Sequence, residues 1–320
     1  MRVGGYLLAI SVSLAVSGAA QAQRILGPMP SAAPTTSSTP PAPVSTESAA
    51  PAAPAPAVAT ESTCKNPNAI GISRVVEIDT AGGPGFGSQH FKAYDFLQPK
   101  EVVLTFDDGP WVTTPILIDA LDKECVKALF FPIGLHATYY PQMLKRHDQR
   151  GDTIGSHTWS HKDLSKLTPD QAKEEIEKGA SAVGLALGHP PAPFFRFPDL
   201  RQPPEMISYL GTRNIGIFST DIDSFDFKMR KPEQVVKSVM AKLKKDGKGI
   251  VLIHENHPWS ANAVAPLLAE LKAGGYKIVH IKAKDPQMQT IPEFDDAVRK
   301  ELGPANVSQR PMSSVVRTVQ

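Results

Sequence analysis

The sequence predicts an α/β domain built on parallel strands, and two patterns support this prediction. Between Thr105 and Ile281, short apolar runs alternate with segments whose apolar residues recur at helical spacing. Polar clusters come directly after the apolar runs, where the carboxyl ends of strands would lie. Because parallel α/β proteins gather functional groups at those ends, both patterns indicate a parallel sheet, either open or closed into a barrel, with a site at one end.

Strands are predicted wherever a short apolar run is bounded by turn residues. These runs are 102–104, 127–132, 153–155, 194–197, 215–220, 249–253 and 276–281.

Helices are predicted between these runs. Residues 113–123 repeat apolar side chains at helical spacing, and residues 169–187 also have acidic residues near their start, where the helix dipole favours negative charge. The predicted helices are 113–123, 140–150, 169–187, 206–212, 232–244 and 262–273.

The first 63 residues differ in composition from the rest. Arg2, an apolar stretch and small residues ending at Ala22 have the layout of a secretory signal peptide, expected at 1–22; a buried N-terminal helix is the alternative. Residues 23–63 are rich in Pro, Ala, Ser and Thr, which predicts a disordered linker. The apolar stretch is shorter than the ~20 residues of a membrane span. We therefore expect an exported protein, periplasmic or secreted, with no transmembrane segment after signal removal.

Residues 64–283 are expected to form one folded domain, and residues 284–320 a peripheral tail with a short helix near 293–302. The chain has 34 basic and 32 acidic residues and no basic stripe with interleaved aromatic residues, so nucleic acid is not expected as a partner. No partner protein can be inferred.

Cys64 and Cys125 are the two cysteines of the chain. An exported protein permits a disulfide between them. The alternative is two unpaired thiols, with Cys125 packed in the core.

Two adjacent carboxylates, Asp107 and Asp108, follow the first apolar run and precede a Gly-Pro turn signal. A buried carboxylate is costly unless it is paired or binds a metal, so we expect partners elsewhere in the chain. His157 and His161 would face the same way if their segment were helical, and both could then bind one metal. With one carboxylate they make a three-ligand set that leaves a position for water, as in catalytic zinc sites. Zinc is the expected metal, and cobalt, manganese, nickel and iron suit the same ligand types.

Two further polar residues follow later strands. Arg196 would hold the second carboxylate ionised and oriented as a base. His254 is a candidate acid, whose pKa either Asp223 or Asp226 would raise. Considered singly, Arg196 is explained as a structural salt bridge and His254 as a core histidine. Their combination with the carboxylates and histidines, in this order, favours a hydrolytic site.

These residues resemble the five motifs of the polysaccharide deacetylase family, also called the nodulation-protein-B homology domain, over about residues 97–281. Members have a distorted (β/α) barrel and remove N- or O-linked acetyl groups from sugars with a divalent metal. The resemblance implies a single distorted barrel of about seven parallel strands. The matching segments are Thr105-Phe-Asp-Asp-Gly109, His157 to His161, Arg196-Phe-Pro198, Asp223 to Phe227 and Leu252-Ile-His254.

The resemblance also implies roles for individual residues. Asp107 would be the general base, held by Arg196, and His254 the general acid, tuned by Asp226. The implied metal ligands are Asp108, His157 and His161. The implied substrate contacts are Phe227 and Leu252 around the acetyl group and the backbone N–H of Asp199 at the oxyanion.

The sequence departs from the family pattern at two places. Asp199-Leu200 replaces an aromatic residue and a glycine, and Phe227 replaces a tryptophan. Glu255 and His257 flank the candidate acid, and we expect both at the rim of the site. Trp111 and Trp159 are each explained by packing or by stacking on a sugar.

Together, these observations predict an exported, metal-dependent enzyme that hydrolyses N-acetyl groups of an acetylated glycan: a chitooligosaccharide, peptidoglycan or an exopolysaccharide. The alternatives are an O-acetyl polysaccharide esterase and a catalytically silent sugar-binding module on the same fold.

Overall fold

The computed structural model describes residues 64–306, so the predicted signal peptide, linker and last part of the tail lie outside the described residues. The strands are β1 (Arg74–Ile78), β2 (Gly85–Phe86), β3 (Glu101–Asp107), β4 (Leu129–Phe131), β5 (Thr153–Ile154), β6 (Phe194–Phe195), β7 (Gly216–Phe218), β8 (Ile222–Asp223), β9 (Gly249–His254) and β10 (Lys277–Ala283). The α-helices are α1 (Thr114–Lys123), α2 (Gly134–Tyr139), α3 (Pro141–Arg150), α4 (Pro169–Leu187), α5 (Pro204–Thr212), α6 (Pro232–Asp246), α7 (Pro258–Ala273) and α8 (Pro292–Asn306). Three 3₁₀ turns are η1 (Leu164–Lys166), η2 (Pro198–Leu200) and η3 (Asp226–Lys228). Among these helices, none is both long and apolar enough to cross a bilayer.

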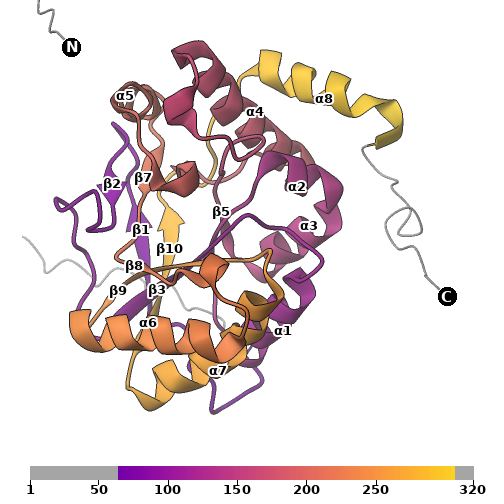
Figure 1. Cartoon of the computed structure of the whole chain (residues 1–320). Helices are drawn as coiled ribbons and strands as arrows, with labels where there is room; N and C mark the ends of the chain where they lie inside the picture. Colours follow the sequence, from indigo (N-terminus) through magenta and orange to yellow (C-terminus); the bar gives the residue numbers. More distant parts are fainter. Residues whose placement is uncertain (1–63, 307–320) are drawn as a thin grey trace, which may run out of the picture. The chain divides into compact units, whose positions relative to one another are not determined.

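Every strand pairing between residues 64 and 306 is parallel. The larger sheet has seven strands in the order β1-β10-β3-β4-β5, with β9 paired to both β3 and β8. The smaller sheet has the order β2-β7-β6, and a bridge between Ser156 and Phe195 joins it to the end of β5. The predicted parallel α/β fold is confirmed, with its barrel divided between two sheets (Figure 1).

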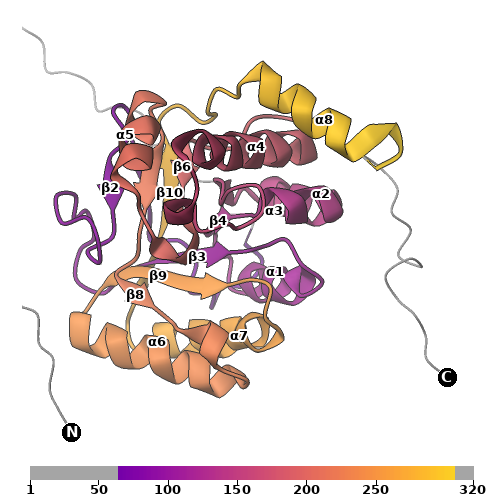
Figure 2. The ribbon, with the colours of Figure 1, turned by 45° about the horizontal axis from the view of Figure 1, so that its top comes forward.

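Side chains that alternate along the strands fill two apolar layers, as the pleat of a strand requires. Val103 of β3 packs in one cluster with Phe131, Phe194, Phe218 and Ile250, which come from four other strands. The neighbouring positions of β3 pack in a second cluster with residues of α1, α6 and α7. Figure 2 shows α6 and α7 along one side of the strands and α2, α3 and α4 along another. The two apolar clusters and the covering helices therefore fix the positions of the carboxyl ends of the strands.

The predicted elements are present with small shifts in their ends, while several short elements were not predicted. The strands β1, β2 and β8 and the six-residue helix α2 have no clear apolar period in the sequence. The predicted tail helix lies inside α8, which packs on α4 (Figure 2). Val298 of α8 is fully buried in a cluster with Trp159 and Ala182. The domain boundary at residue 283 stays a prediction.

A disulfide joins Cys64 to Cys125, with the two Cα atoms 5.6 Å apart. The sequence leaves open a disulfide or two unpaired thiols, and the structure contains the disulfide. It ties the start of the described chain to the segment between α1 and β4.

Candidate active site

Asp107 ends β3 with its side chain buried against the fully buried guanidinium of Arg196. Nη1 of Arg196 donates to Oδ1 of Asp107 at 2.6 Å and to Oγ1 of Thr105 at 2.7 Å. Its Nε and Nη2 donate to the carbonyl oxygens of Phe218 and Ser219. The arginine therefore holds one oxygen of Asp107 and is itself fixed by three other acceptors, as a planar fork of donors allows.

Asp108 turns away from the strand, with a left-handed backbone (φ 68°). Oδ2 accepts a hydrogen bond from Nδ2 of Asn256 at 3.3 Å, and the backbone carbonyl lies 2.6 Å from Nδ1 of His136. Oδ1 is buried and has no hydrogen-bond partner among residues 64–306. Glycine follows, and a Cβ at Gly109 would lie 1.8 Å from Oε2 of Glu255, so any other residue there would displace the Glu255 side chain. A buried carboxylate oxygen without a hydrogen-bond partner, such as Oδ1 of Asp108, is costly and indicates that a ligand binds there.

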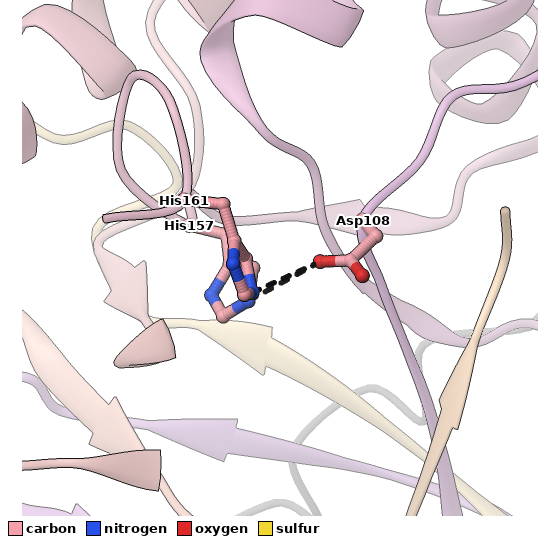
Figure 3. Close-up of side chains that lie close together, drawn as sticks. All are labelled: Asp108, His157 and His161. Carbon is pink, nitrogen blue, oxygen red and sulfur yellow. Dashed lines mark ion pairs between the residues drawn. The ribbon is translucent and has the colours of Figure 1, made fainter. Parts of the chain in front are cut away.

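His157 and His161 both direct Nε2 at the unpaired Oδ1 of Asp108, at 3.5 Å and 3.4 Å (Figure 3). Nδ1 of His157 lies 2.6 Å from the carbonyl oxygen of Arg196. A carbonyl only accepts, so Nδ1 carries the hydrogen and Nε2 keeps its lone pair. Burial, followed by the charge of His161, lowers the pKa of His157 to about 3, so this ring is neutral as a metal ligand must be.

The segment that carries the two histidines is a loop rather than the helix that would have made them converge by periodicity. Thr158 and His161 adopt left-handed φ angles of 68° and 59°. Helix α4 holds the loop: the carbonyl oxygen of Glu175 accepts from the N–H of Trp159 at 2.7 Å, and Gly179 permits close contact with Thr158. Such conformations cost about 1–3 kcal/mol each and persist where the surroundings impose them.

The donor set of Asp108, His157 and His161 fits a divalent cation. The three ligand atoms lie within 4.8 Å of one another. Two ligands of one tetrahedral zinc ion lie about 3.3 Å apart, close to the oxygen–nitrogen distances found here. The carbonyl that accepts from Nδ1 of His157 is the outer partner that ligating histidines commonly have.

His254 ends β9 directly opposite Asp107 in the register of β3 and β9. Its Nδ1 lies 2.6 Å from Oδ1 of the fully buried Asp226, whose Oδ2 accepts from the N–H of His254 and from the hydroxyl of Ser260. Burial alone would lower the pKa of His254, but the hydrogen bond and charge of Asp226, with the charges of Asp108 and Asp107, raise it to about 10.

Asp223, the other candidate for tuning this histidine, takes a different place. Its Oδ1 accepts from the N–H of Phe225 at 2.8 Å, and burial raises the pKa of its carboxyl group.

Comparison with known proteins identifies the family of this chain. The family model "Polysaccharide deacetylase" matches residues 96–215. A chitin deacetylase of Colletotrichum lindemuthianum is 31% identical over 196 residues, which are 58% of this chain and 79% of the fungal protein. This chain belongs to the polysaccharide deacetylase family.

Two further relatives are deacetylases by name. A peptidoglycan-N-acetylglucosamine deacetylase of Listeria monocytogenes is 34% identical over 186 residues, which cover 57% of this chain and 38% of the relative. The solved structure of a peptidoglycan deacetylase of Bdellovibrio bacteriovorus is 33% identical with a TM-score of 0.61, covering 67% of this chain and 59% of the other. The chain thus spans less than two thirds of the length of each of these two relatives.

The three residues expected to contact substrate in this polysaccharide deacetylase differ in their surroundings. Leu252 is buried in β9 and, two residues before His254, shares its face of the strand. Phe227 is 43% exposed, with its ring centre 5.7 Å from that of His254. Asp199 is exposed with a left-handed φ of 53°, and among residues 64–306 its carboxylate forms no ion pair. Its backbone N–H makes no hydrogen bond within the same range and is available to a ligand.

Glu255 was expected at the rim, and this prediction is wrong. The side chain is almost fully buried beneath Gly109 and bonds to the hydroxyl of Thr114 and, at 3.3 Å, to Nε2 of the fully buried His147. Because its carboxylate has these hydrogen-bond partners inside the protein, Glu255 can be buried away from water.

The two tryptophans near the motifs differ. Trp159 is buried and packs against Ala182, while Trp111 is half-buried with its ring centre 4.7 Å from that of His136. Sequence reasoning missed several groups that support the site, because a single polar residue next to an apolar run gives no signal of its partner. These groups are Thr105, His136, His147, Asn256, Trp259 and Ser260.

Proposed function

We propose that this chain is an exported, metal-dependent enzyme that hydrolyses N-acetyl groups of a polysaccharide or oligosaccharide. The observation that carries the proposal is the buried Oδ1 of Asp108, which has no hydrogen-bond partner in the described part of the chain and faces two imidazole nitrogens at 3.4–3.5 Å. The names of the peptidoglycan and chitin deacetylases among the relatives support an acetylated glycan as the substrate. Chitooligosaccharides, peptidoglycan and exopolysaccharides carry the required group.

Asp108, His157 and His161 would hold the divalent cation, with zinc as the first choice. When bound, such a cation supplies Lewis acidity toward the acetyl carbonyl and lowers the pKa of water. The layout of a signal peptide supports export, as does the disulfide, because disulfides persist in oxidising compartments.

Asp107 would take a proton from the attacking water. Arg196 engages its Oδ1, so Oδ2, 3.9 Å from Nε2 of His157, is the oxygen that faces the ligand set. As the water oxygen adds to the acetyl carbon, the N–H of Asp199 would donate to the developing oxyanion.

His254 would complete the reaction. Because Nδ1 is held by Asp226, the proton goes from Nε2 to the sugar nitrogen while the carbon–nitrogen bond breaks. Acetate and a free amine are the products.

The test is acetate release from N-acetylglucosamine oligomers by the full mature chain, together with its metal content. Wild type should bind about one divalent cation and release acetate, and His157→Ala should lose both. His189→Ala is the matched control, because His189 lies outside the site in a partly exposed pair with Asp148. Release from acetylated xylan alone would indicate the esterase. Metal-loaded wild type that releases no acetate from any acetylated glycan would overturn the proposal.

A further inference from the structure

Aromatic and cationic side chains outside the proposed catalytic set gather beside His254. Trp259 is anchored by its Nε1–H, which donates to the carbonyl oxygen of Asp226 at 2.7 Å. The ring of His257 stacks on Trp259, with centres 4.7 Å apart and planes 18° apart, and lies 6.0 Å from the ring of His254. Cζ of Arg230 lies 4.9 Å from the centre of the Trp259 ring. A guanidinium is thus placed against the Trp259 ring, and His257 lies between that ring and the candidate acid.

A second group lies on η3 and the residue before it. Phe225 and Phe227 are 41% and 43% exposed, which is unusual for large apolar rings. Nζ of Lys228 lies 4.9 Å and 5.2 Å from their ring centres, and Nζ of Lys242 lies 4.2 Å from that of Phe225. The left-handed backbone of Phe225 (φ 56°) is fixed by the hydrogen bond from its N–H to Asp223. Rings held exposed in this way offer faces on which a sugar can stack.

Among residues 64–306, two cations of this region lack an acidic partner. Arg230 and Lys228 are exposed, and neither has a carboxylate within ion-pair distance in the part of the chain that the structure describes. Glu233, in the first turn of α6, is exposed and pairs with neither. Arg230 uses Nη1 for the carbonyl oxygens of Met229 and Phe227, while its Nε and Nη2 make no hydrogen bond within residues 64–306. Two nitrogens of the guanidinium are therefore available to donate to a ligand.

A neutral sugar can stack on an aromatic ring without any charged group nearby. Binding of a neutral glycan therefore does not explain why Arg230 and Lys228 lie beside these rings. A carboxylate matches the arginine fork and forms charge-assisted hydrogen bonds with it. We propose that Arg230 and Lys228 bind a carboxylate on a sugar neighbouring the one that is deacetylated, so that the preferred substrate is an anionic N-acetylated glycan. This inference rests on the proposed deacetylase function and names its substrate class.

The experiment compares three oligosaccharides of equal length on the full mature chain. They are neutral tetra-N-acetylglucosamine, a tetrasaccharide of alternating N-acetylglucosamine and N-acetylmuramic acid with free carboxylates, and the methyl ester of that tetrasaccharide. We expect the ratio of kcat/KM for the free acid to that for the ester to exceed one, to fall with added salt, and to drop about fivefold in Arg230→Gln. Arg230→Lys should retain part of the ratio, because it keeps the charge and loses the fork.

Lys245→Gln is the matched control, since it removes one exposed charge near the opposite end of α6 and should leave the ratio unchanged. Binding of the same ligands to full-length Asp107→Asn by calorimetry gives a readout that does not depend on turnover. The inference is supported if the free acid binds more tightly than the ester and this difference is lost in Arg230→Gln. This holds even if wild type releases no acetate, because the absence of acetate release counts against the proposed function alone. The inference is overturned if wild type shows the same kcat/KM and the same affinity for the free acid and the ester. It is also overturned if Arg230→Gln changes these values by the same factor for all three ligands.

Discussion

Nη1 of Arg196 lies 2.6 Å from Oδ1 of Asp107, in an ion pair whose arginine is fully buried. The two residues are 89 positions apart in the sequence. They meet because Asp107 ends β3, Arg196 directly follows β6, and both strands end at the same side of the fold. A pair this deeply buried gives little net stability compared with an apolar pair, but breaking it leaves a buried charge uncompensated. The pair therefore holds one carboxylate in place while Asp108, its neighbour, is left open to a ligand.

Replacing Arg196 tests this description. Arg196→Lys keeps the charge but leaves some of the four buried acceptors of the guanidinium without a donor, so we expect the free energy of unfolding to fall by about 3 kcal/mol. Urea unfolding measures the change. Arg201→Lys makes the same substitution in a half-exposed pair with Asp163 and should cost less than about 1 kcal/mol. Equal losses for the two variants would show that the buried fork has no special role.

The pH profile of kcat/KM should report the pair of Asp226 and His254. Because Asp226 raises the pKa of His254, this histidine stays protonated in neutral and mildly alkaline solution and loses its proton only near pH 10. Asp226→Asn removes the carboxylate charge, so the alkaline limb should move to lower pH by about one unit or more. Asp223→Asn is the comparison variant: Asp223 bonds to a backbone N–H and acts on His254 only through its charge, so the limb should move less than in Asp226→Asn. An alkaline limb that stays in place in Asp226→Asn contradicts this assignment.

Loss of the disulfide should lower stability without changing the fold. The bridge between Cys64 and Cys125 spans 61 residues, a loop for which the chain-entropy estimate is about 4 kcal/mol. The double variant Cys64→Ser, Cys125→Ser should unfold at lower urea concentration, and a reducing agent should shift wild type to the same midpoint. The midpoint of the double variant should not respond to the reducing agent, and a wild-type midpoint that also fails to respond would contradict the bridge.

The order of apolar runs in the sequence was enough to predict which distant residues share one end of the fold. Parallel strands bring their carboxyl ends together, so Asp107, Arg196 and His254 could be grouped without knowing any loop. The conformation of residues 157–161 could not be predicted in the same way. Thr158 has no intrinsic preference for a left-handed backbone, and contacts with α4 impose it there.

The buried carboxylate of Glu255 shows a second limit. A glutamate after a strand end gives the same local pattern whether it faces water or the interior. The difference depends on His147, which is 108 residues away on the buried face of α3, and on the missing Cβ of Gly109. Partners this far apart in sequence are set by tertiary packing, which no local period records.

His147 should make stability depend on pH. It lies fully buried between Glu255 and Asp152, at 3.3 Å and 3.1 Å. Burial alone would lower the pKa of His147, but the charge of Glu255 and the hydrogen bonds to Asp152 and Glu255 raise it to about 9. The unfolded chain has a pKa near 6.5 at this position. The folded protein thus holds the proton more tightly, so this contribution is complete below about pH 6.5 and is lost as pH rises through 9.

A shift of this size corresponds to about 3 kcal/mol, which urea unfolding at pH 6.5, 8 and 9.5 can measure. Wild type should lose stability across this range, and His147→Gln should be less stable at pH 6.5 but lose less as the pH rises. His280→Gln is the matched control: burial lowers the pKa of His280 to about 4, so this buried histidine stays neutral throughout the range and its replacement should not alter the slope. If wild type and His147→Gln lose stability in parallel between pH 6.5 and 9.5, His147 is not the charged centre that joins Glu255 to Asp152.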